Sequence, residues 1–253
     1  MAKLEVFTLE GLPEIRPGDD LASLILASLA ANGMTLADGD VIALAQKIVS
    51  KAEGRFVALA SIVPSAEAKK YAAETGKDAR LVEVLLREST EVLRTRPGLM
   101  IVEDRRGLVL ANAGIDASNV PGSSQDKVLL LPADPDASAA KLRDALQAAS
   151  GRKLAVIILD SIGRAWRNGT VGTCIGCAGL PALKDLRGRS DREGRTLMVT
   201  EIGLADEVSA AASLLIGQAA EGTPVAIVRG VPYERAEGRA RDLHRPKDKD
   251  LFR

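Results

Sequence analysis

Two aspartates stand where the chain could bind a metal ion. Asp160 follows the apolar run 156–159 and is followed at once by Ser161. In open α/β sheets, ligands bind beyond the ends of strands, and an aspartate beside a hydroxyl can hold a divalent cation directly or through water. Arg164 and Arg167 would then donate planar hydrogen bonds to a phosphate or carboxylate. The alternative is that Asp160 only caps the turn after the strand.

The second aspartate, Asp116, lies in the segment 112–119, Asn-Ala-Gly-Ile-Asp-Ala-Ser-Asn, whose small side chains would let a ligand approach the backbone. Hard cations such as Mg²⁺ and Mn²⁺ prefer oxygen ligands, and a cation that bridges polyphosphate oxygens uses carboxylates of this kind. Asp116 and Asp160 together therefore indicate such a cation more strongly than either does alone. Taken singly, Asp116 also fits a turn in which it hydrogen-bonds its own backbone.

The usual phosphate-binding glycine motifs are missing from the sequence. It contains no Gly-x-x-x-x-Gly-Lys-Ser/Thr run, and no Gly-x-Gly-x-x-Gly between a strand and a helix. A nucleotide would need another cradle, for which the segments 50–55 and 217–222 are weak candidates. Lys51 in the first of them is by default a solvated charge, with contact to a phosphate as the alternative.

Cys174 and Cys177 are the only cysteines, and their spacing is typical of a redox pair or half of a zinc site. There is no second cysteine pair, and the single histidine, His244, lies in a charged tail. A zinc site with four ligands would need carboxylates from elsewhere. We therefore favour a role outside the chemistry for both cysteines, with zinc or redox function as the alternative.

The composition limits the class of protein. The chain has 253 residues and 46% hydrophobic content, enough for a substantial core in one large domain or two small ones. Its 34 basic and 34 acidic residues produce no overall field that would attract nucleic acid or an anionic membrane. The apolar runs are far shorter than the ~20 residues that cross a bilayer. The start shows no export signal, so we expect a cytoplasmic protein.

Hydrophobic periodicity predicts the elements that must position these residues. Strands are expected at 4–9, 41–45, 92–94, 99–102, 108–110, 128–131, 154–159, 196–200 and 225–228, and helices at 21–32, 65–74, 79–87, 138–149 and 205–218. The elements from 128 to 159 form a candidate β-α-β unit. Residues 111–127 are predicted to be a functional loop, and 160–179 is a second glycine-rich stretch. The mixture predicts an α/β fold of the mixed α+β kind.

Several segments, taken in order along the chain, closely resemble the coenzyme F-420-0:L-glutamate ligase family, the gamma-glutamyl ligases of deazaflavin coenzyme biosynthesis. The matching segments are 10–13, 39–41, 48–55, 112–119, 160–164 and 205–207. They recur in family order from Leu4 to about Gly230. Runs as long as Ile-Val-Ser-Lys-Ala-Glu-Gly-Arg at 48–55 are much more specific than a short motif.

The resemblance implies a two-lobed fold peculiar to the family, with residues 1–232 as the catalytic unit, 233–253 as a charged tail, and a homodimer as the assembly. It implies an enzyme that uses GTP to join L-glutamate to the carboxylate of F-420-0 through an acyl phosphate, releasing GDP and phosphate. It also implies a divalent cation, Mg²⁺ or Mn²⁺, with K⁺ as an additional candidate. The alternatives are a related carboxylate-amine ligase with another substrate or with ATP, and a homologue that binds nucleotide and metal without turnover.

Carried over position by position, the resemblance also assigns site residues. Asp116 and Asp160 would hold one cation, Ser161 and Gln218 a second, and Lys51 would assist catalysis. The residues that would line the GTP site are Glu10, Gly11, Leu12, Pro13, Gln46, Lys47, Lys51, Asn119, Ile216, Gly217, Gln218, Ala219, Ala220, Glu221, Gly222 and Thr223. Gln218 stands where family members have an acidic residue, and an amide is a poorer cation ligand than a carboxylate. The second cation is therefore the weaker expectation.

Overall fold

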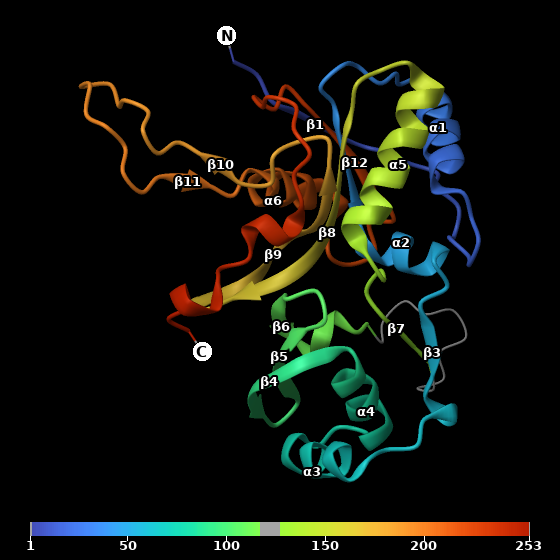
Figure 1. Cartoon of the computed structure of the whole chain (residues 1–253). Helices are drawn as coiled ribbons and strands as arrows, with labels where there is room; N and C mark the ends of the chain where they lie inside the picture. Colours follow the sequence, from blue (N-terminus) through green and yellow to red (C-terminus); the bar gives the residue numbers. More distant parts are fainter. Residues whose placement is uncertain (1, 117–126, 253) are drawn as a thin grey trace.

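The larger of two lobes is built on a five-stranded sheet (Figure 1). The computed structural model describes residues 2–116 and 127–252. In the order in which they pair, the strands of this sheet are β1 (Glu5–Thr8), β12 (Val225–Arg229), β2 (Val41–Ala45), β8 (Ala155–Arg164) and β9 (Arg167–Ala178). Within this sheet β2 and β8 are parallel, and the other described neighbours are antiparallel. The fold is therefore mixed, as the sequence predicts.

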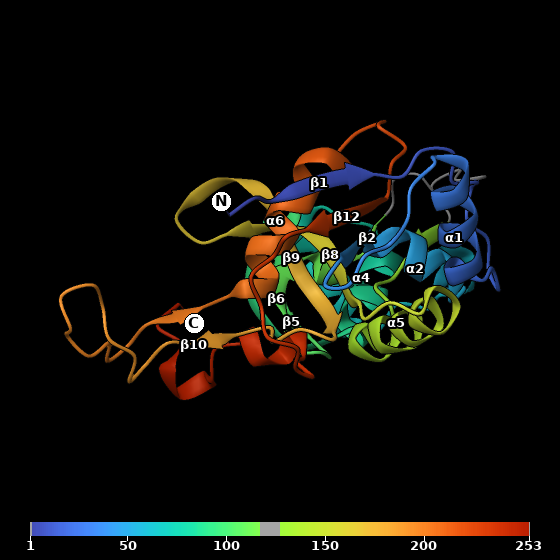
Figure 2. The ribbon, with the colours of Figure 1, turned by 90° about the horizontal axis from the view of Figure 1, so that it is seen from above.

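Helices cover both faces of this sheet (Figures 1 and 2). On one face α1 (Leu21–Ala31) and α5 (Pro135–Ser150) pack on Ile42 and Leu44, and on the other α6 (Leu204–Ile216) packs on Val41 and Ala43. A central strand buried on both faces has no polar side, which is why β2 reads as an unbroken apolar run.

The smaller lobe is inserted between α2 (Gln46–Ala52) and α5. Its elements are β3 (Phe56–Ala58), α3 (Ala66–Thr75), α4 (Ala79–Arg87), β4 (Ser89–Arg96), β5 (Leu99–Asp104), β6 (Val109–Ala111) and β7 (Lys127–Leu129). The strands β4, β5 and β6 form one antiparallel sheet, and β3 pairs with β7. A separate core that includes Val82, Leu85 and Met100 holds the helices on the three-stranded sheet.

Charged side chains link the smaller lobe to the rest of the chain. Where the chain enters the lobe, the guanidinium of Arg55 donates to the Leu131 carbonyl oxygen at 3.0 Å and to Glu88 at 3.2 Å. Near the end of the chain, Lys247 lies 3.0 Å from a carboxylate oxygen of Glu103 in β5. These contacts fix the lobe that carries Asp116 relative to the sheet that carries Asp160.

The topology gathers four segments at one edge of the large sheet. The parallel strands β2 and β8 run toward the same edge, while β12 begins there and β1 ends there. The Ala45 amide donates to the Pro224 carbonyl at 2.9 Å, and the Leu9 amide donates to the Val225 carbonyl at 3.0 Å. The segments that follow β1 and β2, and the one that precedes β12, therefore meet beside Asp160.

The strand before Asp160 is longer than predicted. It continues to Arg164 and forms a hairpin with β9 in which Asp160 lies opposite Thr173. The interpretation of Asp160 as a cap of a following turn is therefore wrong, and the glycine-rich stretch 160–179 consists mainly of the end of β8 and of β9. Its glycines serve packing, because a Cβ at Gly172 would lie 2.5 Å from the Ser209 carbonyl of α6 and one at Gly176 would lie 2.4 Å from Pro135 of α5.

Two other expectations about strands are wrong. The strand expected at 128–131 does not form a β-α-β unit with β8, because β7 pairs with β3 in the smaller lobe and the parallel partner of β8 is β2. The strand expected at 196–200 is displaced to β11 (Glu201–Ile202), which pairs with β10 (Lys184–Asp185). These short strands form the base of an arm that projects from the body of the molecule (Figures 1 and 2).

The last part of the chain returns to the body of the protein. It contains two short 3₁₀ helices, Ala240–Leu243 and Lys247–Lys249, and Ala240 is buried. The division of the chain at residue 232 stays a prediction. Within the described residues, the structure has no helix that is both long and apolar enough to cross a membrane.

Candidate functional site

A pocket of about 420 Å³ opens at the sheet edge where the four segments meet. Its volume lies in the range of small-molecule sites. The residues that line it are 12–15, 45–48, 51, 159–161 and 216–224. Most residues that the sequence predicts for cation and nucleotide binding therefore come together from four separate segments.

The helix α2 positions three of these side chains. It begins directly after β2, so Gln46 and Lys47 stand at the pocket edge, and Lys51 follows one turn after Lys47 on the same side. Gln46 is buried and accepts a hydrogen bond from the Ser50 hydroxyl at 2.8 Å. The Lys51 side chain is only 13% exposed and lies 3.9 Å from Glu14. Lys51 is therefore not the solvated charge that is the default for a lysine.

Asp116 approaches this edge from the smaller lobe. Its backbone exchanges two hydrogen bonds with Leu129, at 2.9 and 2.8 Å, and its carboxylate lies 2.5 Å from the Lys47 ammonium. Partial burial raises the pKa of Asp160, and the nearby negative charge of Asp116 raises it further, whereas the Ser161 amide and Lys47 lower it. Both carboxylates thus share one electrostatic environment with Lys47.

A strained turn precedes Asp116. Asn112, Ala113 and Gly114 have φ values of 50°, 53° and 65°, so three consecutive residues lie in the left-handed region. A residue with a Cβ rarely adopts this conformation, and such strain persists only where the surroundings impose it. Here the Asn112 side-chain oxygen accepts the Met100 amide at 3.1 Å, and Ala113 is fully buried. The small residues of this motif are therefore needed for the turn that delivers Asp116.

Gln218 meets Ser161 across the pocket. The Ser161 hydroxyl donates to the Gln218 side-chain oxygen, so the two residues predicted for a second cation are adjacent. The loop that holds Gln218 is closed by Glu221, whose carboxylate accepts the Ala219 amide at 2.7 Å. Glu221 also fills the space over Gly217, where a Cβ would lie 2.1 Å from the Glu221 carboxyl carbon. Glu221 is therefore occupied in shaping the loop.

Comparison with known proteins identifies the family to which the sequence is related. The family model described as F420-0:Gamma-glutamyl ligase matches residues 11–230. This chain belongs to that family. Proteins named coenzyme F420:L-glutamate ligase are 47% identical to it in Methanothermobacter thermautotrophicus (99% of both chains), 46% in Methanopyrus kandleri (100% of both) and 44% in Archaeoglobus fulgidus (99% of this chain and 97% of the relative). The resemblance seen in the sequence is thereby confirmed.

Several residues that the sequence or the family resemblance predicts for the site do not line the pocket or lie outside the described residues. Glu10 and Gly11 directly precede the pocket-lining residues but do not line the pocket, and the Glu10 carbonyl accepts the Ser28 hydroxyl at 2.9 Å. Arg164 and Arg167 are exposed at the end of the β8–β9 hairpin, away from the pocket lining. Asn119 lies outside the described residues, as do the two residues before it.

Sequence reasoning missed part of the lining. Glu14 and Ile15 extend the matched segment 10–13, and Pro224 directly follows the assigned run 216–223. Their proximity to matched segments was the available signal. Ile48 and Leu159 carry no chemical signal, because apolar residues of this kind are also expected in the core.

The two cysteines of this family member are both buried in the core between the sheet and α6. The pairing of β8 with β9 shifts its register between Ile158 and Leu159, and this irregularity brings residues three apart to one face. A hydrogen bond with Cys177 and burial raise the pKa of Cys174 well above its usual range. The described residues include no group of three histidine, cysteine or acidic side chains that could hold a metal ion. The zinc alternative therefore gains no support.

Proposed function

We propose that this protein joins L-glutamate to the carboxylate of F-420-0 and uses GTP to drive the reaction. The observation that carries the proposal is the gathering of four segments of the larger lobe around one pocket of about 420 Å³, with Asp116 of the smaller lobe paired to the pocket residue Lys47. Relatives that cover almost the whole chain are named coenzyme F420:L-glutamate ligase. The volume, the paired carboxylates and the lysines of the pocket suit a nucleotide with its phosphates.

The chemistry requires activation because a carboxylate oxygen is a poor leaving group at neutral pH. In the proposed reaction the carboxylate attacks the γ-phosphorus of GTP, the bond to the bridging oxygen breaks, and GDP leaves. The resulting acyl phosphate is then attacked by the amine of L-glutamate. The new C–N bond forms, phosphate leaves, and the amine loses its proton. No nucleophile from the protein is needed, which agrees with the buried state of both cysteines.

The lysines of α2 are suited to the phosphoryl-transfer step. Lys51 is largely buried in the pocket wall and Lys47 lies at the pocket edge, so both can place positive charge beside a triphosphate. Charge at this point stabilises the oxygens of the transferring group, where most of the catalytic effect in such reactions arises. Water exclusion by the loop 217–222 would strengthen these interactions and protect an acyl phosphate from hydrolysis.

The donor set fits a divalent cation. Asp116 and Asp160 are near enough for the charge of one to raise the pKa of the other, and Ser161 adds a hydroxyl beside them. Such a cation would neutralise charge on the phosphate oxygens. Because the described residues supply no third acidic ligand in a cluster, nucleotide oxygens and water would complete its coordination, as is usual for Mg²⁺.

The deciding experiment is incubation of the purified protein with F-420-0, L-glutamate, GTP and Mg²⁺ or Mn²⁺, with product mass and phosphate release as readouts. The proposal expects a product extended by a glutamyl unit and one phosphate per bond formed. Product formed only with ATP would mean that ATP, and not GTP, drives the reaction. Product formed only with another acid or amine in a substrate panel would point to a related ligase. A chain that binds GTP but releases no phosphate with both substrates present would be a homologue without turnover.

A further inference from the structure

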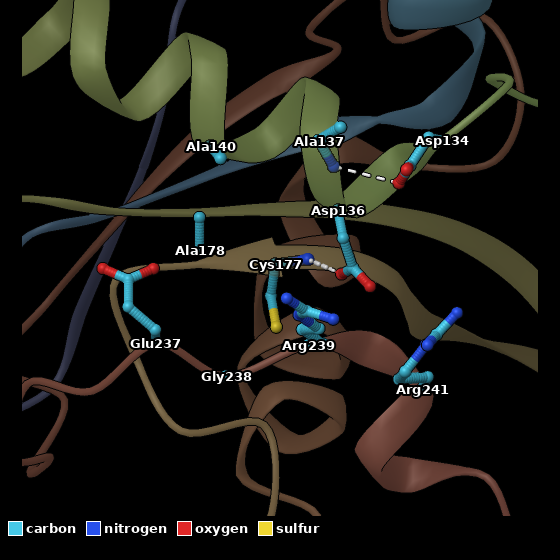
Figure 3. Close-up of a pocket in the computed structure, with 10 residues that line it drawn as sticks. All are labelled: Asp134, Asp136, Ala137, Ala140, Cys177, Ala178, Glu237, Gly238, Arg239 and Arg241. Carbon is cyan, nitrogen blue, oxygen red and sulfur yellow. Dashed lines mark hydrogen bonds between the residues drawn. The ribbon is translucent and has the colours of Figure 1, made fainter.

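A second pocket, of about 390 Å³, lies apart from the first and shares no lining residue with it (Figure 3). We call it the α5 pocket, because its walls are the start of α5 (134–140), the end of β9 (177–178) and the segment 237–241. Nothing in the proposed reaction uses these residues. The volume is within the range that holds a small ligand.

One carboxylate at the centre of the α5 pocket has a structural task. Asp136 accepts the Cys177 amide and the Ala240 amide, each at 2.9 Å. It therefore fastens the returning segment to the sheet edge and to the first turn of α5. Figure 3 shows Asp136 between α5 and the β9 backbone.

The other two carboxylates of the pocket are also engaged. Asp134 caps α5 by accepting the Ala137 amide at 3.0 Å. Both oxygens of Glu237 accept hydrogen bonds from Arg143, at 2.6 Å each. Each of the three acids therefore already has a hydrogen-bond donor within the protein.

Two arginines, by contrast, lack such partners. Arg239 and Arg241 line the pocket, and neither forms an ion pair with any residue that the structure describes. They flank Ala240, which is 2% exposed and held by Asp136. Just before them, a Cβ at Gly238 would lie 2.4 Å from the Leu180 carbonyl oxygen, so only glycine lets the segment run this close to the body. The backbone that carries both guanidinium groups is therefore fixed in place.

The remaining lining is small and apolar. Ala137, Ala140 and Ala178 leave the space that makes up much of the pocket. The N-terminus of the 16-residue helix α5 is already occupied by its cap Asp134 and by Asp136, so the two arginines are the groups available to an anion. Guanidinium groups bind carboxylate and phosphate oxygens through paired hydrogen bonds.

We propose that the α5 pocket binds a small organic anion, whose carboxylate or phosphate group is held by Arg239 and Arg241 and whose compact uncharged part rests on the three alanines. A carboxylate ligand and a phosphate ligand would use the same two arginines. The experiment therefore tests L-glutamate and inorganic phosphate separately.

Methyl NMR with ¹³C-labelled alanine gives a readout that is specific to each pocket. Ala137, Ala140 and Ala178 report on the α5 pocket, whereas Ala45, Ala219 and Ala220 report on the first pocket. We expect at least one of the two anions to shift the methyl signals of the α5 pocket in a saturable way. Saturation by phosphate alone would identify a phosphorylated ligand, and saturation by L-glutamate alone a carboxylate. If neither anion shifts these methyls, the proposal is wrong.

A pair of double variants tests the role of the arginines. Arg239→Gln with Arg241→Gln should weaken the response at the α5 pocket at least about tenfold, because charge-assisted hydrogen bonds are lost. Arg94→Gln with Arg96→Gln removes the same charge from the exposed strand β4 and should leave the affinity unchanged. Equal affinities in the two double variants would overturn the proposal. Unchanged alanine spectra without ligand would show that both variants are folded.

Discussion

Two polar side chains of the first pocket have partners from distant parts of the chain. Lys47 is paired with Asp116 of the smaller lobe, and Ser161 with Gln218. A buried polar group without a partner is costly, so a pocket that must open to ligands benefits from such exchangeable partners. Binding of a cation or phosphate would then replace one set of interactions with another.

The Asp160→Asn variant should lose activity without losing stability. Burial raises the pKa of Asp160 in the folded state above its value in the unfolded chain. The protonated side chain therefore contributes to stability below the unfolded pKa, and this contribution is lost as the pH rises through the folded pKa. At neutral pH the ionised side chain therefore opposes folding. We expect Asp160→Asn to lower the ligation rate by about a hundredfold or more, with an equal or higher thermal midpoint at pH 7. A variant that ligates at the wild-type rate under limiting metal would refute the cation role.

Lys47→Met tests whether the Lys47 ammonium competes with a cation for Asp116. The Lys47 side chain is 36% exposed, so solvent screens the ion pair and limits its contribution to about 1 kcal/mol. Without nucleotide, the variant should bind Mn²⁺ about fivefold more tightly, as measured by calorimetry. It should also bind GTP more weakly. Lys47→Arg keeps the charge and serves as the control, and equal Mn²⁺ affinity in all three proteins would contradict the competition.

Gln218→Glu tests the second cation. A carboxylate at this position would face Ser161 and add the negative charge that the amide lacks. The metal concentration for half-maximal activity should fall a few-fold to about tenfold. Glu221→Gln is the matched change in the same loop, and because Glu221 binds the Ala219 amide rather than facing Ser161, its midpoint should not fall. Unchanged midpoints in both variants would mean that this loop serves nucleotide binding alone.

At the scale of elements, hydrophobic periodicity predicts the strands and helices whose apolar faces are buried in a core. The strand 41–45 and the helix 79–87 have the predicted bounds, because their apolar faces meet a core. The helix α2 is not predicted, since it is seven residues long and lies against the pocket. The continuation of β8 beyond Leu159 is not predicted because residues 160–164 mix polar residues, glycine and a single isoleucine and pair only with β9. Such pairing depends on contacts far along the sequence.

The sequence predicts some residues of the site and not others, because their meeting in the fold depends on contacts far along the chain. Lys51, Ser161 and Gln218, all assigned from the family resemblance, line one pocket, although no local sequence pattern shows that they meet. The strain of the turn at 112–114 was hidden, because the motif shows only that its residues are small. Arg239 and Arg241 gave no signal in a charge-dense tail. Their position depends on Gly238 and on Asp136, which lies about a hundred residues earlier in the chain.

Gly114→Ala should disturb the element that delivers Asp116. Gly114 has a φ of 65°, and an added Cβ would lie 2.7 Å from a methyl group of the fully buried Leu131. We expect a loss of about 1–3 kcal/mol in the free energy of unfolding, measured by denaturant titration. Activity should fall further than the loss of stability explains, because Asp116 lies only two residues after Gly114. Gly151→Ala, at a similar φ of 68° but with open space around it, isolates the backbone effect and should be milder.

At the scale of the whole molecule, the antiparallel return of β12 and the insertion of a second lobe bring early, middle and late segments to one edge. The site therefore forms only when all strands of the sheet are in place.

Several apolar side chains that do not line the first pocket are exposed elsewhere on the molecule. Met198 and Val199, on the projecting arm, are 74% and 84% exposed, and Trp166 at the hairpin end is 88% exposed. Exposed apolar groups of this size are typical of association surfaces.

We therefore predict that the protein forms a homodimer in which the arm contributes to the interface. Light scattering should give twice the chain mass of 26.6 kDa. Met198→Asp with Val199→Asp would bury charge without a partner in such an interface, so this variant should be monomeric at micromolar concentration. Val63→Asp alters an equally exposed side chain in the smaller lobe and should remain dimeric. A monomeric wild-type protein, or a dimeric arm variant, would contradict this assembly.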